Sequence, residues 1–468
     1  MTNDNVNGSF YKVAPNNGIP KVIIEKTKLL AFWENLGYRK LILKNGKFEL
    51  VKVSNNSIVE LVEDYRLADE IRNHLEESNH EIVYEEILKR DYASVSMIKY
   101  LKGIEIDFSN GHSKEAQFFY KNGVVKISSE NYSVVPYNEY EGYVWKHQII
   151  DRPFIPTNDY RKAVFAKFVN NLAGQNLERF ASLRSIIGYM LHSFKDQTNS
   201  PAIILLDEDM DLNQEEARGG KGKSLFAKGI GMIVSYYFKE GKNFNKNFLF
   251  SGLEKHHKVI FLDDVKKDFD FESLYAIITG DFSLEKKFKN EEVIPFSESP
   301  KILISSNYMV SGVRGFSEER RKIEFEISSH YGKHLTPFQE FGHRFFDDWD
   351  ENEWSKFDSF MLICCKDYLK YGLIKPESIN LIDNKLKTET HPKFVEFMDE
   401  EIKEDCKIDK RDFLAKFREK YKPEFFGLSP NQFSKWLTIW ADFRGHQFDH
   451  KKSNGKQYFE VIIKKINL

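Results

Sequence analysis

The first part of the chain mixes two hydrophobic periodicities. Residues 40–53 (KLILKNGKFELVKV) alternate apolar and polar positions around an Asn45-Gly46 turn, which predicts a β-hairpin. Residues 57–78 (SIVELVEDYRLADEIRNHLEES) carry apolar positions at helical spacing. Further on, an Asn122-Gly123 turn separates two short strands, and residues 160–194 return to helical spacing. We therefore expect a small α+β domain at 1–110 and a β-hairpin with a helical collar at 111–200.

The middle of the chain alternates strand-length apolar runs with polar turns and helices. The runs AIILL, VIFLDD, KILISSN and KIEFEI follow residue 200 and predict an α/β sheet core at 201–345. Helical periodicity around 354–371 predicts a helical connector at 346–390. The last part, 391–468, has helical segments followed by a hairpin that turns at Asn454-Gly455, an order that indicates a winged-helix-like domain.

Composition narrows the class of protein. The 468 residues are 41% hydrophobic and 30% charged, which is enough apolar surface for folded cores in about three domains. Lys and Arg (69) nearly balance Asp and Glu (71), so a uniformly basic coat for nucleic acid is excluded, while a local basic groove is not. Three cysteines exclude a disulfide framework, and the apolar runs are far shorter than a membrane span. With no targeting segment at the start, we expect a cytoplasmic protein without a membrane partner.

One segment has the composition of a phosphate-binding loop. Residues 217–224 (ARGGKGKS) follow the strand AIILL through a polar loop and open the helical stretch SLFAKGIGMIVSYYF. Glycines allow backbone N–H groups to face a triphosphate, Lys223 would neutralise the β and γ phosphates, and Ser224 would bind Mg²⁺. A glycine-rich turn without a ligand is the alternative, and the GKS ending disfavours it. The predicted nucleotide-binding residues are Gly219, Gly220, Lys221, Gly222, Lys223, Ser224 and Leu225.

Paired carboxylates follow the next apolar run. The segment KVIFL leads into Asp263 and Asp264, downstream of the phosphate loop. A buried strand in this position delivers its first carboxylate, Asp263, to the Mg²⁺ ion, and Asp264 then orients or deprotonates the attacking water. Adjacent acids at a strand end are often only a solvated turn, so this assignment depends on the loop before it.

Two further polar motifs complete the candidate site. Asn307 ends the run KILISSN, where its amide can bond the γ-phosphate or the water. Arg320 and Arg321 precede KIEFEI, and an arginine that reaches a neighbouring subunit's nucleotide stabilises charge during phosphoryl transfer. A surface ion-pair cluster with the preceding glutamates is the alternative for the arginines. With ATP and Mg²⁺ as ligands, the predicted catalytic residues are Lys223, Asp263, Asp264, Asn307, Arg320 and Arg321.

The four motifs GGKGKS, VIFLDD, ILISSN and EERRKIEF, in this order, resemble superfamily 3 helicases, in particular the primase-helicase ATPases of phages, plasmids and poxviruses. The resemblance covers about residues 160–327, including the helical segment LERFASLRSIIGYMLHSF before the ATPase. It implies an AAA+ P-loop ATPase core at 201–345, a homo-hexameric ring with ATP hydrolysed at subunit interfaces, and 3′-to-5′ tracking on single-stranded DNA. The family commonly has an Asn in the loop, where this chain has Gly220 and Lys221.

A basic hairpin is predicted between the paired acids and Asn307. Residues 279–290 (TGDFSLEKKFKN) indicate two short strands around a basic turn, similar to the pore hairpin of that family. Lys286, Lys287, Phe288 and Lys289 combine positive charge with an aromatic face, which suits single-stranded DNA. A solvated basic turn is the alternative.

The end of the chain is a second candidate for DNA contact. Residues 407–468 contain 14 Lys or Arg against 7 Asp or Glu. The helix SPNQFSKWLTIWADF and lysines of the following hairpin fit duplex DNA, and protein contact is an equally good alternative. Trp436 and Trp440, at helical spacing, are expected in the core rather than on bases.

The sequence therefore predicts an ATP-dependent replicative DNA helicase of a phage, plasmid or integrated element, acting in a bacterial or phage-infected cell. Its expected partners are single-stranded and forked DNA, further copies of itself, and a primase or polymerase. The alternatives are an ATP-switched origin-binding initiator or scaffold, and an ATPase sensor in anti-phage defence. No structural zinc is expected at His256-His257 or Cys364-Cys365, which lack partners at ligand spacing. The N-terminal domain could be a primase, but its candidate carboxylates near 104–107 are isolated, which favours a non-catalytic adaptor or loader-binding domain.

Overall fold

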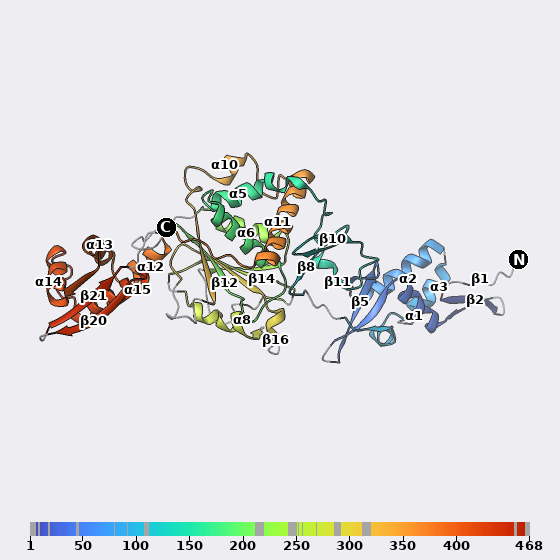
Figure 1. Ribbon diagram of the computed structural model, residues 1–468. Coiled ribbons are helices and arrows are strands. Elements are labelled where there is room, and N and C mark those ends of the chain that lie inside the picture. The colour runs from blue at the N-terminus through green and yellow to red at the C-terminus, as the bar shows by residue number, and fades with distance from the viewer. Residues whose placement is uncertain are drawn as a thin grey trace.

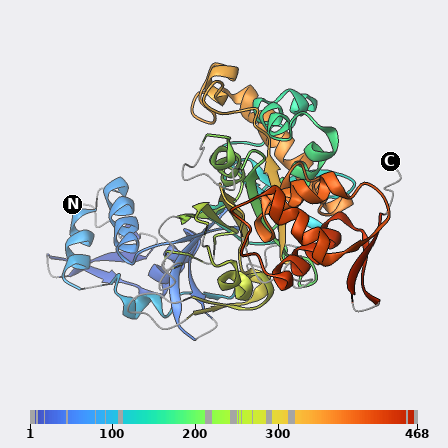
Figure 2. The same cartoon turned by 90° about the vertical axis from the view of Figure 1, so that its left-hand side faces the viewer.

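The computed structural model shows three parts that lie in a row: an N-terminal part, a central α/β part and a C-terminal part (Figure 1). Turned by 90°, the C-terminal part, in red, lies in front of the central part (Figure 2). No helix that the structure describes combines the length and the apolar composition needed to cross a bilayer. The structure describes residues 6–7, 10–16, 19–43, 46–78, 80–90, 92–106, 112–210, 220–241, 250, 252–254, 256–267, 269–284, 292–310, 320–453 and 456–463.

The N-terminal part contains an antiparallel sheet of order β1-β2-β3 and a mixed sheet of order β11-β6-β5-β4-β7. The edge strand β11 lies at 144–145, so the mixed sheet includes residues beyond the region 1–110. Helices pack beside both sheets around Trp33 and Tyr38, which are fully buried. The elements are β1 (Val6–Asn7), β2 (Tyr11–Asn16), β3 (Ile19–Ile24), α1 (Lys26–Asn35), β4 (Tyr38–Ile42), β5 (Phe48–Ser54), β6 (Ile58–Leu61), α2 (Tyr65–Ser78), α3 (Glu81–Leu88), α4 (Val95–Ile98), β7 (Gly103–Ile104) and β11 (Val144–Trp145).

Residues 57–78 were expected to be helical throughout, and this is wrong for their first part. Residues 58–61 form strand β6, and α2 begins only at Tyr65. Val59 pairs with Val53 of β5 and is buried, so β-branched side chains packed in a sheet override the local helical spacing.

A three-stranded antiparallel sheet and two helices link the N-terminal part to the central sheet. The hairpin predicted at Asn122-Gly123 is confirmed, because Tyr120 pairs with Gly123. The Asn176 side chain accepts hydrogen bonds from the first N–H groups of α6 and so fixes where that helix begins. The elements are β8 (Glu115–Tyr120), β9 (Gly123–Ser128), β10 (Tyr132–Val135), η1 (Lys146–Gln148), η2 (Asn158–Lys162), α5 (Val164–Leu172) and α6 (Leu177–Leu191).

The predicted α/β core is present as a five-stranded parallel sheet of order β13-β14-β17-β12-β18. Along β12, Ile203 and Leu205 join one hydrophobic core, while Ala202, Ile204 and Leu206 join the core on the other face. Both faces are therefore buried, as parallel sheets require. Helices α5, α6 and α11 cover one face and α8 the other (Figure 1). The elements are β12 (Ala202–Asp207), α7 (Lys223–Gly231), β13 (Tyr236–Glu240), β14 (Val259–Val265), η4 (Phe271–Leu274), α8 (Tyr275–Thr279), β15 (Phe282–Leu284), β16 (Glu292–Ile294), η5 (Phe296–Glu298), β17 (Lys301–Ser306), β18 (Lys322–Ile327), α10 (Pro337–Phe341) and α11 (Glu351–Tyr371).

Two helices of this part differ from the sequence pattern. The stretch 224–238 was expected to be one helix, but α7 ends at Gly231 and residues from Tyr236 onward form β13, whose pairing with β14 decides the outcome. Helix α11 lies in the region expected to be a connector, but it packs along α6 in the hydrophobic core that contains Ile203 and Leu205. A Cβ at Gly188 of α6 would lie 2.2 Å from the Cys364 carbonyl oxygen, so glycine permits this close approach.

The C-terminal part has its own core and the predicted order of helices followed by a hairpin. Strands β20 and β21 pair from Gln447 with Ile462 to Ser453 with Lys456. Trp436 and Trp440 are buried in this core, as expected. The elements are α12 (Leu381–Glu389), α13 (Pro392–Glu401), β19 (Cys406–Asp409), α14 (Lys410–Lys420), α15 (Pro430–Arg444), β20 (Gln447–Ser453) and β21 (Lys456–Ile462).

Candidate functional site

The candidate site lies at the carboxyl edge of the central sheet. β12 ends at Asp207, β14 carries Asp263 and Asp264 near its end, β17 leads into Asn307, and α7 begins at Lys223. β12 is the switch point of the sheet, because β17, β14 and β13 lie on one side of it and β18 on the other. Ligands of open α/β sheets bind beyond the carboxyl ends of the strands at such a point.

Two glycines shape the entry into α7. Gly220 and Gly222 have φ values of 94° and 98°, in the left-handed region that favours glycine. At Gly222 a Cβ would also lie 3.0 Å from the Phe168 ring and 3.1 Å from Leu172. Glycine therefore lets the backbone turn into the helix close to α5. Gly219 lies outside the described residues. Leu225 is partly buried and packs against the hydrophobic core that contains Ile203 and Leu205.

The Lys223 side chain reaches from the start of α7 to the ends of β12 and β17. Its Nζ donates to Asp207 Oδ1 at 2.6 Å and to Asn307 Oδ1 at 2.7 Å. The side chain is largely buried, so its charge lies in a region where electrostatic interactions are stronger than in water. An ammonium group has three N–H donors, which leaves one for a further acceptor such as a phosphate oxygen.

Ser224 and Asp263 place oxygen atoms suited to a metal ion side by side. The Ser224 hydroxyl donates to both carboxylate oxygens of Asp263, at 3.0 Å and 2.9 Å. A hydroxyl and a carboxylate side by side fit Mg²⁺, which prefers oxygen ligands and completes its shell with water and phosphate oxygens.

A bulge in β14 sets the direction of the paired acids. Leu262 pairs with Ile304 and Val265 with Ser306, so the two aspartates oppose Ser305 alone. Asp264 has a φ of 55°, which is uncommon for a residue with a side chain and typical of functional sites. The Ser305 hydroxyl bridges the pair, because it donates to Asp263 Oδ1 at 2.5 Å and accepts from the Asp264 N–H at 2.8 Å.

Asn307 connects the lysine with the second acid. Its Oδ1 accepts from Lys223, and its Nδ2 donates to Asp264 Oδ1 at 2.8 Å. A chain of hydrogen bonds thus runs from Asp207 through Lys223 and Asn307 to Asp264, across the ends of β12, β17 and β14. The structure brings Lys223, Ser224, Asp263, Asp264 and Asn307 together, in agreement with the sequence motifs.

Three residues of this site were missed by the sequence analysis: Asp207, Asp209 and Ser305. Lys221 Nζ donates to Asp209 Oδ2 at 2.8 Å and to Ser329 Oγ at 3.1 Å. Asp207 ends strand β12, but Glu208 and Asp209 follow it directly, so no local signal distinguishes it from its acidic neighbours. Ser305, directly before the Ser306-Asn307 pair, gave no signal of its own, because its role depends on the bulge in the neighbouring strand.

The two missed carboxyl groups differ in their titration. Burial raises the pKa of Asp207, and the charge and hydrogen bond of Lys223 oppose that rise without cancelling it. Burial acts in the same direction on Asp209, but the hydrogen bond and the charge of Lys221 outweigh it, so the pKa of Asp209 is below its ordinary value. The difference follows from exposure, since Asp207 is the more buried of the two.

The predicted arginines do not join this site within one chain. Arg320 and Arg321 precede β18, whose far end, Ile327, pairs with Asp207. They therefore lie at the amino ends of the parallel strands, whereas the candidate site lies at the carboxyl ends. Six extended residues span about 20 Å, which is the approximate distance between the arginines and the site. The Arg321 guanidinium lies 4.5 Å from the centroid of the Tyr275 ring.

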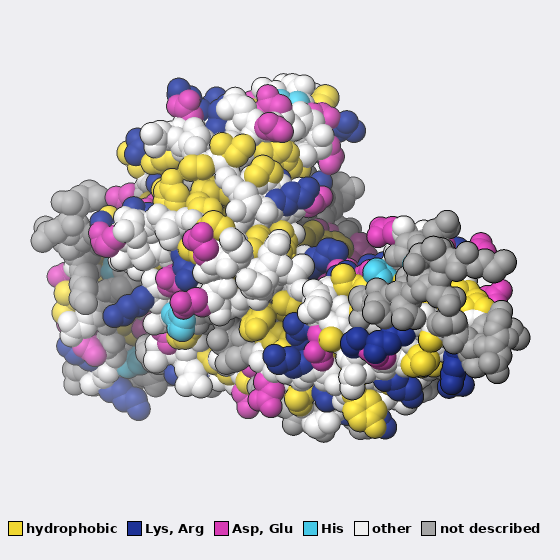
Figure 3. Space-filling model, turned by 90° about the vertical axis from the view of Figure 1, so that its right-hand side faces the viewer, with side chains coloured by type: hydrophobic (Ala, Val, Ile, Leu, Met, Phe, Trp, Pro, Cys, Tyr) yellow, Lys and Arg dark blue, Asp and Glu magenta, His cyan; other side chains and the backbone are white. Residues whose placement is uncertain are grey.

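The predicted DNA-binding residues are only partly covered. Strand β15 lies within the expected segment 279–290, but its antiparallel partner β16 begins at Glu292, beyond that segment. The two strands pair from Phe282 with Ile294 to Leu284 with Glu292. The tip lies outside the described residues, with Lys286, Lys287, Phe288 and Lys289. On the face in Figure 3, Lys and Arg side chains are interspersed with Asp and Glu, in line with the nearly balanced total charge.

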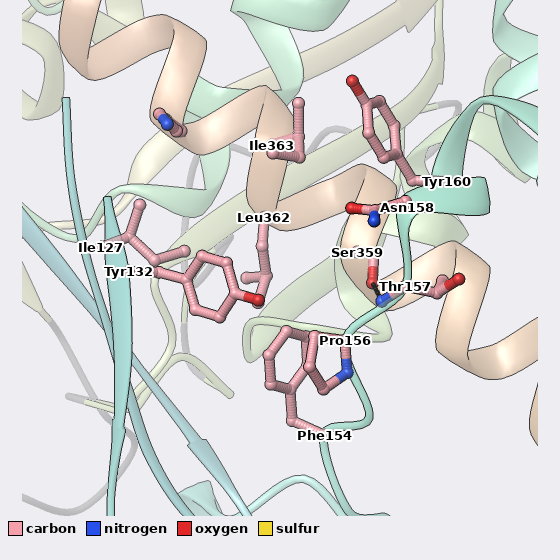
Figure 4. Close-up of a pocket in the computed structure, with 11 residues that line it drawn as sticks. Ile127, Tyr132, Phe154, Pro156, Thr157, Asn158, Tyr160, Ser359, Leu362 and Ile363 are labelled. Carbon is pink, nitrogen blue, oxygen red and sulfur yellow. Dashed lines mark hydrogen bonds between the residues drawn. The ribbon is translucent and has the colours of Figure 1, made fainter. Parts of the chain in front are cut away.

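A cavity of about 250 Å³ lies between the β8–β10 sheet and α11 (Figure 4). Its walls include Tyr132, Phe154 and Tyr160, and Lys366 also lines it. No residue of the candidate site lines it, so it is separate from the strand-end chemistry.

Comparison with protein-family models and with curated proteins gave no match. Solved structures gave matches of low similarity. The A-form apo structure of the NrS-1 C-terminal region has 14% sequence identity and a TM-score of 0.39, and covers 93% of this chain and 99% of that chain. JCV helicase, bound to a small molecule, has 12% identity and a TM-score of 0.20, over 60% of this chain and 74% of that chain. Drosophila ORC bound to DNA has 11% identity and a TM-score of 0.19, over 67% and 93%. All three TM-scores are below 0.5, so the function proposed below rests on the motifs and geometry of this chain.

Proposed function

We propose that the protein is an ATP-dependent DNA helicase with a superfamily 3, AAA+ P-loop ATPase core. One observation carries this proposal: the ends of β14 and β17 and the start of α7 bring Lys223, Ser224, Asp263, Asp264 and Asn307 into one cluster, whose hydrogen bonds Ser305 completes. A lysine, a hydroxyl, paired acids and an amide in this arrangement are the groups that phosphoryl transfer from ATP to water needs.

Each residue of the cluster has a defined part in the proposed hydrolysis. Lys223 binds phosphate oxygens with its remaining N–H donor, and Ser224 and Asp263 would hold Mg²⁺. When bound, the metal neutralises charge on the β and γ phosphates. Asp264 orients or deprotonates the attacking water. Asn307 holds the Asp264 carboxylate by a hydrogen bond and would also contact the γ-phosphate.

The proposed assembly is a homo-hexameric ring of a phage, plasmid or integrated element, moving on single-stranded DNA at a fork. The hairpin of β15 and β16 would line the channel. We assign the C-terminal part to the winged-helix class, with a primase or polymerase as a further partner. Two lysines of the C-terminal hairpin already have acidic partners, because Lys451 pairs with Glu460 and Lys456 lies 3.6 Å from Asp409. These ion pairs weaken the case for DNA binding by this hairpin.

Strand displacement tests the helicase against its alternatives. We expect Mg²⁺-dependent ATP hydrolysis that single-stranded DNA accelerates, and continuous unwinding of a forked duplex at the same ATP concentration. The measurement follows a fluorescently labelled strand released from the fork, with a non-hydrolysable ATP analogue as control. An initiator or scaffold would bind DNA in response to ATP without processive release, and a defence sensor would show ATPase activity triggered by another ligand. Either outcome contradicts the helicase.

A subunit-mixing experiment tests the arginines. Arg320 and Arg321 lie at the far edge of the sheet from their own site, so only a neighbouring subunit could use them. We expect an Arg320→Ala/Arg321→Ala variant to lose ATPase activity, and an excess of Lys223→Ala subunits to restore part of it, because each variant contributes its intact half. Retention of full activity in the arginine variant would contradict this role. So would a failure of mixing to restore any activity although the two variants co-assemble.

A further inference from the structure

Both lysines of the phosphate loop are held by carboxylates from one short segment. Lys223 contacts Asp207 at 2.6 Å, and Lys221 contacts Asp209 at 2.8 Å. The two acids lie two residues apart, at and just after the end of β12, and the two lysines are also two residues apart. The end of the first strand therefore supplies one negative charge to each positive charge of the loop.

These contacts have the character of internal counter-ions. Each lysine is 8% exposed, and a charge removed from water to that extent requires a compensating charge. The other acceptors of the two ammonium groups are neutral, namely the Asn307 amide and the Ser329 hydroxyl. The countercharge in direct contact with the lysines therefore comes from Asp207 and Asp209.

A nucleotide needs the same two ammonium groups. Phosphate oxygens and carboxylate oxygens carry the same sign of charge and seek the same N–H donors, so they compete for the lysines and repel each other at close range. Asp207 is buried and continuous with a central strand, so it cannot move far from the phosphates. Binding of the nucleotide must therefore either share Lys223 with Asp207 or separate the pair.

We propose that Asp207 and Asp209 determine nucleotide affinity by competing with the phosphates for Lys223 and Lys221. The two carboxylates keep the loop lysines neutralised before the nucleotide arrives, weaken its binding, and speed the release of ADP. This inference rests on the proposed nucleotide-binding function and adds its control of affinity and product release.

The test measures binding of a fluorescent ADP analogue with Mg²⁺ to the full chain, together with its dissociation rate. Asp207→Asn keeps the size of the side chain and an acceptor oxygen but removes the charge, and is expected to lower Kd about tenfold and slow dissociation. Asp209→Asn should act in the same direction by about threefold, because Asp209 is more exposed and its charge is better screened.

A matched control separates competition from general electrostatics. Glu208→Gln removes one negative charge from the same segment, but Glu208 accepts the Ser329 N–H rather than a lysine. We expect its Kd to change by less than about twofold. Thermal unfolding of each variant shows that it is folded, and Asp209→Asn, at the more exposed position, gives the answer if Asp207→Asn does not fold.

The outcomes distinguish the two levels of the proposal. If the parent protein binds MgADP but Asp207→Asn and Asp209→Asn bind it equally or more weakly, or if Glu208→Gln tightens binding as much as they do, competition is overturned. If the parent does not bind MgADP, or if Lys223→Ala binds it as the parent does, the proposed nucleotide site itself fails.

Discussion

Replacing Lys223 with alanine is expected to abolish Mg²⁺-dependent ATP hydrolysis. The Lys223 ammonium is the largely buried cation that meets both Asp207 and Asn307 at the strand ends, so its loss removes the charge that would stabilise the transferring phosphoryl group. Removal of one such stabilising group typically lowers kcat by about 10²- to 10³-fold, and here Asp207 would in addition lose its counter-ion. The measurement is phosphate release with and without single-stranded DNA.

A control on the same helix makes the result specific. Lys228 lies on α7 five residues further on, and its ammonium lies 5.4 Å from the centroid of the Phe346 ring rather than at the strand ends. Lys228→Ala should therefore retain most of the activity. Unchanged turnover in Lys223→Ala, with contaminating ATPases removed, would contradict the phosphate-loop assignment.

The sequence predicted the main part of the candidate site because each motif occupies a strand end or a helix start. Asp263 follows a strongly apolar run, and Asn307 follows another, so both were expected at the carboxyl edge of a buried sheet. Parallel strands bring such positions together whatever their separation in the chain. The hydrogen bonds from Asn307 to both Lys223 and Asp264 are the geometric consequence.

The residues that were missed depend on features that no local pattern carries. Ser305 became important only through the bulge that sets two residues of β14 opposite one residue of β17. Asp207 stands in a run of acidic residues, and only the position of Lys223 on the adjacent helix distinguishes it from the others. Both roles arise from contacts between segments that are distant in the chain.

Errors in the fold have the same cause. Residues 58–61 and 236–238 have helical spacing in the sequence but pair with neighbouring strands, β5 and β14, that local spacing does not reveal. The mixed N-terminal sheet likewise includes β11 from residues 144–145, far along the chain from its other strands. At both 58–61 and 236–238, sheet pairing with another segment overrides the local periodicity.

The hairpin of β15 and β16 is expected to couple hydrolysis to movement on DNA. Its strands are anchored in the core beneath the central sheet, where Phe282 and Ile294 are buried opposite each other. These two strands share that core with β14 and β17, so a force on the residues between them would reach the strands that carry the candidate site. In a ring, several copies of Lys287 and Lys289 would face the channel and contact the phosphates of one strand.

We expect Lys287→Ala/Lys289→Ala to leave basal ATPase activity largely intact but to remove its stimulation by DNA and to abolish fork unwinding. Neither lysine is among the residues proposed to bind the nucleotide, so hydrolysis without DNA should not need them. The dependence of single-strand affinity on salt should weaken as well, by roughly 0.7 in the logarithmic slope for each phosphate that a lysine no longer neutralises. The comparison uses basal ATPase, DNA-stimulated ATPase and unwinding at two salt concentrations.

A second double variant shows whether the position of the removed charge matters. Lys99→Ala/Lys102→Ala removes two exposed lysines from the N-terminal part and should retain both DNA stimulation and unwinding. If the hairpin variant unwinds forks as the parent does, the basic tip is only a solvated turn and the translocating surface lies elsewhere. If both double variants lose unwinding equally, the effect is one of total charge. Loss in the hairpin variant alone, with hydrolysis preserved, is the result that links this hairpin to movement along the strand.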